Sequence, residues 1–152
     1  GVAMSDALFF LRPAKEEDLV VLDAFAAAEG MGSIPCVDCV FVAVSREDSE
    51  IVGFIRLVFD GAGVCHVNPV VVYPSWRGYG VGCALMDYAA QHYGELRLVS
   101  RGSSLAFYEA LGFAPTSWEA IKPEIVAECT QCELYDECNP VPMNKGSQES
   151  ER

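Results

Sequence analysis

This 152-residue sequence has few cationic side chains and few histidines. It contains 10 Lys and Arg against 22 Asp and Glu, with two His, for a formal net charge of −12. Binding to nucleic acid depends on cationic side chains that neutralise phosphates. The charge balance therefore argues against nucleic acid as a partner. It is compatible with a cationic amine substrate, although an acidic surface more often serves solubility.

Long hydrophobic runs are also missing. No apolar run approaches the roughly 20 residues that a membrane-spanning helix needs, and no export signal is visible. Hydrophobic residues make up 51% of the chain and charged residues 21%, which indicates a folded globular protein. We expect a single domain over residues 5–143 in the cytoplasm, without membrane contact. A disordered polar tail is expected over residues 144–152.

Cysteine, in contrast, is abundant, with seven residues. In a reducing cytoplasm most should be free thiols. Cys129, Cys132 and Cys138 follow a C-x2-C-x5-C pattern, and Cys36 and Cys39 form a C-x2-C pair. Metal binding, a redox or disulfide role, and plain thiols all stay open. Zinc usually takes four ligands and the tail offers three, and the Cys36–Cys39 pair could supply a fourth. No metal ligand is assigned.

One stretch, from Val67 to Ala90, reads as a strand, a glycine-rich loop and a helix. The segment Val70 to Tyr73 is β-branched or aromatic, as in a half-buried strand. Pro74 then ends the strand because it has no amide hydrogen. After the loop, apolar residues recur at the spacing of one face of a helix.

The loop itself is Arg77-Gly78-Tyr79-Gly80-Val81-Gly82. Glycines allow a ligand to approach the backbone closely, and the first amides of a helix together with its dipole attract phosphate. Arg77 adds a charge with fork geometry. The loop lacks the Lys and Ser or Thr of a Walker motif, and its third glycine comes one residue too early for a dinucleotide fingerprint.

An R-G-x-G-x-G loop directly after a strand that ends in Val-Tyr-Pro resembles the acyl-CoA pyrophosphate loop of the GNAT superfamily of N-acetyltransferases. A second stretch, Ala106-Phe107-Tyr108-Glu109-Ala110-Leu111-Gly112-Phe113, resembles the F-Y-E-K-L-G-F signature of that family. The resemblance covers residues 8–113. The cysteine run of the tail is similar to that of short bacterial N-acetylglutamate-synthase-like members.

The resemblance implies an α/β (α+β) GNAT fold. Such a fold has a mixed, mostly antiparallel sheet of about six to seven strands flanked by helices, with a β-bulge and splayed central strands. Pro69 fits that bulge. The sequence patterns predict strands at 8–11, 40–44, 51–59, 64–73 and 96–100. Further strands are predicted after Phe113, with interruptions near Pro115 and Pro123. Helices are predicted at 15–29, after residue 80, and at 103–111.

The resemblance also implies acetyl-CoA as co-substrate, held by residues of the strand and the loop. The pyrophosphate would lie on Arg77, Gly78, Tyr79, Gly80, Val81 and Gly82. The pantetheine would pair with the backbone of Val70, Val71 and Val72, and the Val70 amide would stabilise the oxyanion. Many members have Asn where this chain has Arg101, so either Arg101 reaches a cofactor phosphate or Ser103 or Ser104 takes over that role.

Two residues are candidates for acid–base chemistry. Tyr108 lies where many family members place the tyrosine that faces the sulfur of CoA, and a Tyr pKa of about 10 lets it donate to a thiolate while neutral. Many members carry a Glu on the preceding strand; this chain has His66, which titrates in a suitable range for a base. Glu29, Asp38 and Glu109 are weaker base candidates, and His92 is interpreted as structural.

These observations favour an acetyl-CoA-dependent N-acetyltransferase that moves an acetyl group to a primary amine by direct attack. The acceptor is expected to be small and amino-acid-like, and a homodimer is possible. The relatives with similar cysteine tails usually carry Glu and Arg where this chain has His66 and Asn68, which speaks against glutamate itself. Two alternatives stay open: an acyl-CoA-binding sensor without turnover, and a cysteine metal or redox module on a GNAT scaffold.

Overall fold

The computed structural model describes residues 7–146 of the chain. It divides into two compact units, one formed by Gly1–Arg56 and Pro69–Asp87, the other by Leu57–Asn68 and Tyr88–Arg152. Strands β3 and β4 and helix α2 each contribute residues to both units. The predicted domain start at residue 5 and the tail at 147–152 lie outside the described residues.

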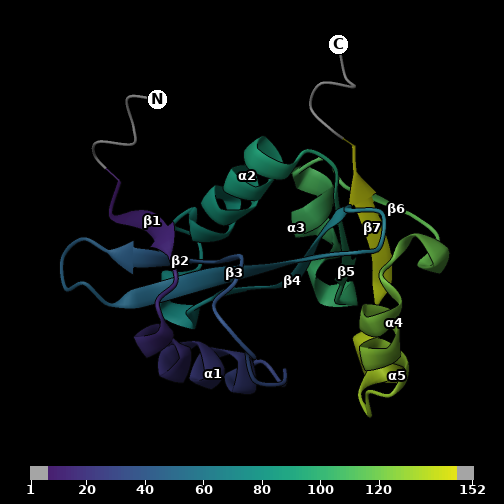
Figure 1. Cartoon of the computed structure of the whole chain (residues 1–152), viewed down its shortest axis with the longest axis horizontal. Helices are drawn as coiled ribbons and strands as arrows, with labels where there is room; N and C mark the ends of the chain where they lie inside the picture. Colours follow the sequence, from purple (N-terminus) through teal and green to yellow (C-terminus); the bar gives the residue numbers. More distant parts are fainter. Residues whose placement is uncertain (1–6, 147–152) are drawn as a thin grey trace. The chain divides into compact units, whose positions relative to one another are not determined.

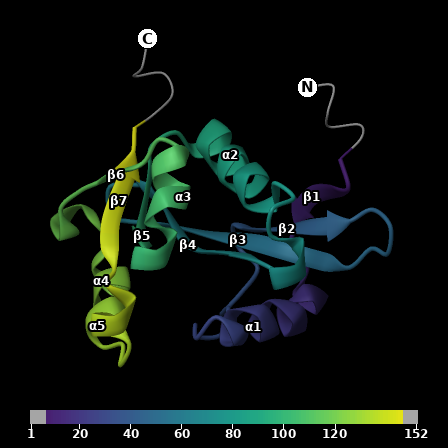
Figure 2. The same ribbon diagram turned by 180° about the vertical axis from the view of Figure 1, so that it is seen from behind.

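The strands form a seven-stranded sheet in the order β1-β2-β3-β4-β5-β7-β6, and helices flank it (Figures 1 and 2). Pairing is antiparallel for β1–β2, β2–β3, β5–β7 and β6–β7, and parallel for β4–β5. The predicted mixed, mostly antiparallel α+β fold is thereby confirmed. The strands are β1 Phe9–Pro13, β2 Val40–Ser45, β3 Ile51–Phe59, β4 Cys65–Val72, β5 Leu96–Ser100, β6 Ala114–Pro115 and β7 Val141–Lys145.

Within residues 7–146, five α-helices and several short 3-10 turns connect the strands. The α-helices are α1 Leu19–Ala28, α2 Val81–Tyr93, α3 Leu105–Ala110, α4 Pro123–Thr130 and α5 Tyr135–Cys138. The 3-10 turns are η2 Glu16–Asp18, η3 Pro74–Trp76, η4 Gly102–Ser104 and η5 Trp118–Ala120.

In the first unit, α1 packs its apolar side against β2 and β3 (Figure 1). Leu22 and Ala26, one helical turn apart, are fully buried there, as the helical spacing of apolar residues predicts. The same core takes Ile34 from the loop after α1, because the Ile34 N–H donates to Asp23 Oδ1 over 2.7 Å and ties that loop back to the helix. The helix, its following loop and the sheet thus form one hydrophobic cluster.

An ion pair fixes the start of α1 to β1. The Arg12 guanidinium donates to both carboxylate oxygens of Asp18, over 2.8 Å and 3.2 Å, and the Lys15 N–H donates to the same carboxylate over 2.7 Å. Asp18 is 7% exposed. The hydrogen bond from Arg12, and next the one from Lys15, hold the pKa of the Asp18 carboxyl below its usual range against the opposing effect of burial.

Asp18→Asn is expected to lower the free energy of unfolding by about 2 kcal/mol at pH 7, since it removes a charge from a bidentate, largely buried pair. The folded-state pKa of Asp18 is lowered, so its contribution is present above an unfolded pKa of about 4 and is lost as the pH falls through the folded-state value. Urea unfolding from pH 3 to 7 measures this. The unfolding free energy of Asp18→Asn should approach that of the wild type at low pH. The control variant Glu16→Gln, at an exposed neighbouring position, should have the unfolding free energy of the wild type at every pH.

The second unit has its own core around β5 and β7. Leu96, Leu98 and Met143 are each at most 1% exposed. Helices α4 and α5 follow one another beside β7 in both views (Figures 1 and 2). These two helices differ from the prediction, which had interrupted strands here. Pro123 occupies the first turn of α4, where its missing amide is no loss, so it starts a helix rather than breaking a strand.

Two further boundaries differ from the sequence-based expectation. Strand β7 extends to Lys145, with Met143 fully buried, so residues 144 and 145 belong to the sheet and not to a disordered tail. The recorded register shift lies between Ala43 and Val44 of the β2–β3 pair. Strand β4 runs without a break from Cys65 to Val72 through Pro69, and a bulge at Pro69 stays a prediction.

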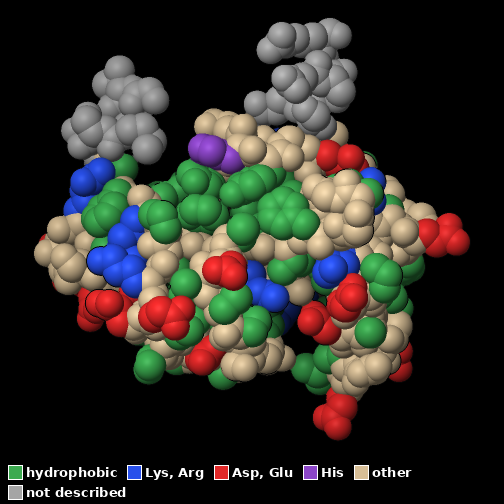
Figure 3. Space-filling model, viewed as in Figure 1, with side chains coloured by type: hydrophobic (Ala, Val, Ile, Leu, Met, Phe, Trp, Pro, Cys, Tyr) green, Lys and Arg blue, Asp and Glu red, His purple; other side chains and the backbone are tan. Residues whose placement is uncertain are grey.

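Acidic side chains are scattered over the visible face and do not gather in one patch, and Lys and Arg are few (Figure 3). This agrees with the net charge of −12. Among the described residues, none of the helices combines the length and the apolar character that crossing a bilayer requires.

Candidate functional site

The glycine loop connects β4 to α2 within the first unit. Gly78 and Gly80 have φ angles of +89° and +84°, a region that side chains other than glycine rarely adopt. A Cβ built at either glycine would meet nothing within 4 Å. The sequence thus has glycine here for its backbone conformation, and the space in front of the loop is open to a ligand.

The loop leads directly into the N-terminus of α2. The Ala84 N–H makes a first-turn bond to the Gly80 carbonyl over 2.9 Å, so the amides of Val81 and Gly82 precede the helical bonding pattern. Val81 is 1% exposed and anchors the helix in the core. Its side chain therefore packs in the core and cannot contact a ligand. These amides carry the positive end of the helix dipole, which suits an anion such as a diphosphate.

Arg77 is the first residue of the loop and directly follows η3. Its Nη2 is 3.1 Å from Glu29 Oε2, at the C-terminal end of α1. The Arg77 side chain is 57% exposed and that of Glu29 24%. The predicted phosphate ligand is thus engaged with a carboxylate in this structure, a contact that the sequence analysis did not foresee.

Strand β4 supplies the other predicted cofactor residues of the first unit. Val71 is 6% exposed and packs in the core, while Val70 and Val72 on either side are half-buried. This alternation is that of a strand with one face on the core. The parallel pairing of β4 with β5 joins Cys65 to Leu96 and His66 to Arg97, before the strand reaches Val70.

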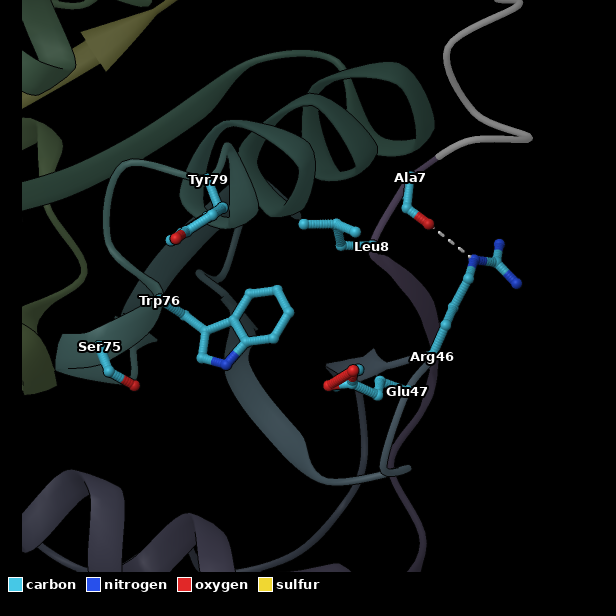
Figure 4. A pocket seen from close by; sticks show the side chains of 8 residues that line it. Ala7, Leu8, Arg46, Glu47, Ser75, Trp76 and Tyr79 are labelled. Atoms are coloured by element: carbon cyan, nitrogen blue, oxygen red, sulfur yellow. Dashed lines mark hydrogen bonds between the residues drawn. The ribbon is translucent and has the colours of Figure 1, made fainter.

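An open pocket of about 640 Å³ lies beside the glycine loop in the first unit (Figure 4). Trp76 and Tyr79 form one side of it, with ring centroids 5.5 Å apart. Arg46, whose Nε donates to the Ala7 carbonyl over 3.0 Å, lies on another side. The Tyr79 side chain, 58% exposed, thus lines this pocket. The remaining lining residues are Leu8, Ser45, Glu47 and Ser75.

Tyr108 lies on α3 in the second unit. Its ring makes edge contacts with Phe107 and Phe113, at centroid distances of 5.0 Å and 5.8 Å. Burial raises the pKa of the Tyr108 hydroxyl to about 12, and the charge of Arg101 opposes this in part. The hydroxyl is therefore neutral and a hydrogen-bond donor throughout the physiological range.

The turn before α3 contains Ser104, the predicted cofactor contact of the second unit. Ser104 is the N-cap residue of α3 but its side chain makes no capping bond, and its N–H donates to the Arg101 carbonyl over 2.9 Å. Gly102 packs closely: a Cβ there would lie 3.1 Å from the Cys138 carbonyl. The end of α5 thus supports the turn that leads into the Tyr108 helix.

His66 does not have the surroundings of a base. It is 0% exposed, its Nε2 accepts from the Lys122 N–H over 3.0 Å, and its Nδ1 lies 3.0 Å from the Val64 carbonyl. Since Nε2 accepts, the proton of a neutral ring is on Nδ1 and donates to Val64. Both nitrogens are occupied, so the geometry favours a structural role over the catalytic one that the sequence suggested.

A polar pair on the same strand was not identified from the sequence. Asn68 Nδ2 donates to Glu128 Oε1 of α4 over 3.2 Å, and the pair is exposed. The two residues are 60 positions apart, and no local pattern signals such a contact. Asn68 precedes the predicted oxyanion donor Val70 by two residues, so a carboxylate reaches β4 from α4.

None of the seven cysteines, all of which lie within the described residues, forms a disulfide in this structure. Residues 7–146 contain no group of three or more His, Cys, Asp or Glu that could hold a metal ion. Burial raises the pKa of the Cys129 thiol, and the nearby Cys138, Glu128 and Cys132 raise it further. A higher pKa means less thiolate at neutral pH, which makes Cys129 less reactive.

Comparisons with known proteins bear on this geometry. The family model described as "Acetyltransferase (GNAT) domain" matches residues 37–115, which include β4, the glycine loop and α3. No curated protein matches the chain.

Solved structures share the fold. N-acetylglutamate synthase from Neisseria gonorrhoeae, solved with coenzyme A and N-acetyl-glutamate, has a TM-score of 0.75 at 14% identity, over 93% of this chain and 36% of that one. Rv2747 from Mycobacterium tuberculosis, solved with CoA, has a TM-score of 0.71 at 14% identity, over 90% and 98%. Ard1 from Thermoplasma volcanium has a TM-score of 0.71 at 19% identity, over 93% and 99%.

The chain therefore spans about a third of the Neisseria synthase and nearly all of the other two proteins. At these identities the structural likeness concerns the fold. The family model covers 79 of 152 residues (37 through 115), just over half of the chain. This protein belongs to the GNAT acetyltransferase family.

Proposed function

We propose that this protein is an acetyl-CoA-dependent N-acetyltransferase whose acceptor is a primary amine. The observation that carries the proposal is the glycine loop, in which two residues with positive φ leave open space before the amides that start α2. Family membership and the CoA bound in the Neisseria and Mycobacterium structures support it.

The donor would be held by backbone groups and one cation. The amides of Gly78 to Gly82 and the guanidinium of Arg77 would take the diphosphate. The backbone of Val70 to Val72 would pair with the pantetheine as an added strand, with the Val70 amide donating to the oxyanion. Ser104, at the start of α3, is proposed as a further contact to the cofactor.

Direct attack by the amine on the thioester needs stabilisation of the leaving thiolate. Tyr108 is proposed for this task because its hydroxyl is neutral and has a pKa of about 12. The attacking amine must first lose its proton. His66 is occupied on both nitrogens, so we propose that the amine passes this proton to water.

The finer parts of the function are also proposals. We infer that residues 5–143 act together as one acetyltransferase domain and that the acceptor is small and amino-acid-like. The similar structures include an N-acetylglutamate synthase and Naa50 from Arabidopsis thaliana with a bisubstrate analogue, so a peptide amine is the main alternative. A cytoplasmic location and a homodimer belong to the same set of proposals.

Calorimetry with CoA tests the loop. Gly80→Val places a β-branched residue at a φ of +84° and fills the space before the helix amides. We expect its affinity for CoA to fall at least about tenfold, since close backbone approach is lost. Gly63→Val is the matched control, because Gly63 has a φ of +82° and open space around it, in the β3–β4 turn. Equal affinity of both variants would contradict the assigned site.

A sensor that binds acyl-CoA without turnover is the second candidate. The occupied His66 is the observation in its favour, since no base is evident on β4 itself. Release of free CoA from acetyl-CoA in the presence of a panel of amines separates the two functions. Turnover that depends on the amine identifies the enzyme, whereas CoA binding with no amine-dependent release identifies the sensor.

A further inference from the structure

The contact between Glu29 and Arg77 joins the end of α1 to the start of the glycine loop. Arg77 Nη2 and Glu29 Oε2 are 3.1 Å apart. The contact is not isolated: one turn earlier on α1, Phe25 stacks on Tyr73 at a centroid distance of 5.4 Å and an interplanar angle of 29°. Phe25 of α1 and its C-cap residue Glu29 thus meet the two residues that flank η3, Tyr73 and Arg77, with the same spacing of four on both sides.

Glu29 is in an unfavourable place for a carboxylate. It is the C-cap residue of α1, and no basic residue stands in the last turn of that helix. The C-terminal end of a helix carries partial negative charge, which repels a carboxylate and favours a cation. Helix stability therefore does not explain an acidic residue here, whereas pairing with Arg77 does.

Arg77 is the more exposed of the two partners. Its side chain is 57% exposed and Glu29 24%, and an exposed ion pair of this type is weak. A diphosphate offers a guanidinium more charge and two-pronged hydrogen bonds. The phosphate oxygens of a ligand on the glycine loop can therefore replace the Glu29 carboxylate as the partner of the Arg77 guanidinium, while Glu29 stays close to the end of α1.

We infer that Glu29 is an internal competitor for the diphosphate of the cofactor. In the ligand-free protein it occupies Arg77, and cofactor binding exchanges the carboxylate for phosphate oxygens without any covalent step. Glu29 thereby sets the affinity for CoA. This inference rests on the proposed function of the glycine loop.

Calorimetric titration with CoA at low ionic strength tests the exchange in four proteins: the wild type, Glu29→Gln, Arg77→Gln and the double variant. Glu29→Gln should bind CoA about two- to fivefold more tightly, the range expected for loss of one exposed competing pair. Arg77→Gln should bind more weakly. In the Arg77→Gln background the Glu29 substitution should have no effect, because the competition needs both partners.

Salt and a control variant make the result specific. The gain in Glu29→Gln should shrink at 0.5 M salt, where exposed charges are screened, and Glu16→Gln on the neighbouring η2 should bind like the wild type. Unchanged or weaker binding by Glu29→Gln, or an equal gain in the Arg77→Gln background, overturns the inference while leaving the CoA site standing. Absence of CoA binding in the wild type overturns both proposals.

Discussion

Tyr108→Phe is expected to reduce kcat for amine-dependent CoA release by about 10²- to 10³-fold, the range typical of a lost acid or hydrogen-bond donor. The hydroxyl is the only group removed, and the ring contacts with Phe107 and Phe113 can persist in the variant. The affinity for CoA and the unfolding midpoint should therefore stay close to those of the wild type. Stopped-time assays of CoA release, with calorimetry in parallel, measure both.

The pKa of Tyr108 defines how it acts. At about 12 it lies roughly 3.5 units above an ordinary thiol, so complete proton transfer to the thiolate would be uphill by about 5 kcal/mol. Tyr108 is thus better suited to stabilise the thiolate by donating a hydrogen bond, and the thiolate can take its proton later from solvent. Tyr108→Phe should therefore lower kcat and leave KM unchanged.

A pH profile checks the same residue. Because the pKa of Tyr108 is raised, its protonated form persists below about pH 11, and kcat should rise with pH as the amine loses its proton, with no falling limb between pH 7 and 10. Arg101 opposes the raised pKa of Tyr108, so its removal raises that pKa further, and Arg101→Gln should also show no falling limb between pH 7 and 10. A kcat of Tyr108→Phe within threefold of the wild type would sink the proposed role.

Local patterns in the sequence were sufficient for much of the fold. The strands at 51–59 and 96–100 match β3 and β5 to the residue, because their apolar β-branched runs are bounded by turn residues. The glycine loop and the Tyr108 helix were found for the same reason, since each depends on a short segment. The region after Phe113 was misjudged, because Pro123 fits both a strand break and a helix start.

Contacts between distant residues could not be read from the sequence. The occupied nitrogens of His66 depend on Lys122, 56 positions away, and the partner of Arg77 is 48 positions away. Neither contact has a periodicity or spacing that would signal it. The residue types indicated what chemistry was available, and only the folded arrangement shows that both ring nitrogens of His66 have partners and that Arg77 is paired with a carboxylate.

A second large effect is expected at Gly53, a buried residue of β3. It pairs with Ala43, next to the register shift of the β2–β3 ladder. A Cβ at Gly53 would lie 2.9 Å from the Val71 carbonyl oxygen and 2.9 Å from Val81 Cγ1. The first contact is to the backbone of β4, and the second is to the residue that starts α2, so neither atom belongs to a flexible side-chain end.

Gly53→Ala is therefore expected to lower the free energy of unfolding by about 2 kcal/mol, in the range of overpacked cores. It should also weaken CoA binding, because relief of the clash must move β4 or the first turn of α2, and these flank the glycine loop. Urea unfolding and calorimetry measure the two effects on the same preparations. The folded fraction of each variant, measured by circular dichroism, gives the concentration of native protein with which the CoA affinity is calculated.

Gly32→Ala is the matched control for this substitution. Gly32 lies in the loop after α1, in the same unit, and a Cβ there meets nothing within 4 Å. Its unfolding free energy should change by less than about 0.5 kcal/mol and its CoA affinity not at all. If Gly53→Ala were as stable as Gly32→Ala and bound CoA equally well, the close packing of β3 under the loop would not govern the cofactor site. A loss of affinity in the folded fraction of Gly53→Ala alone ties that packing to the loop geometry.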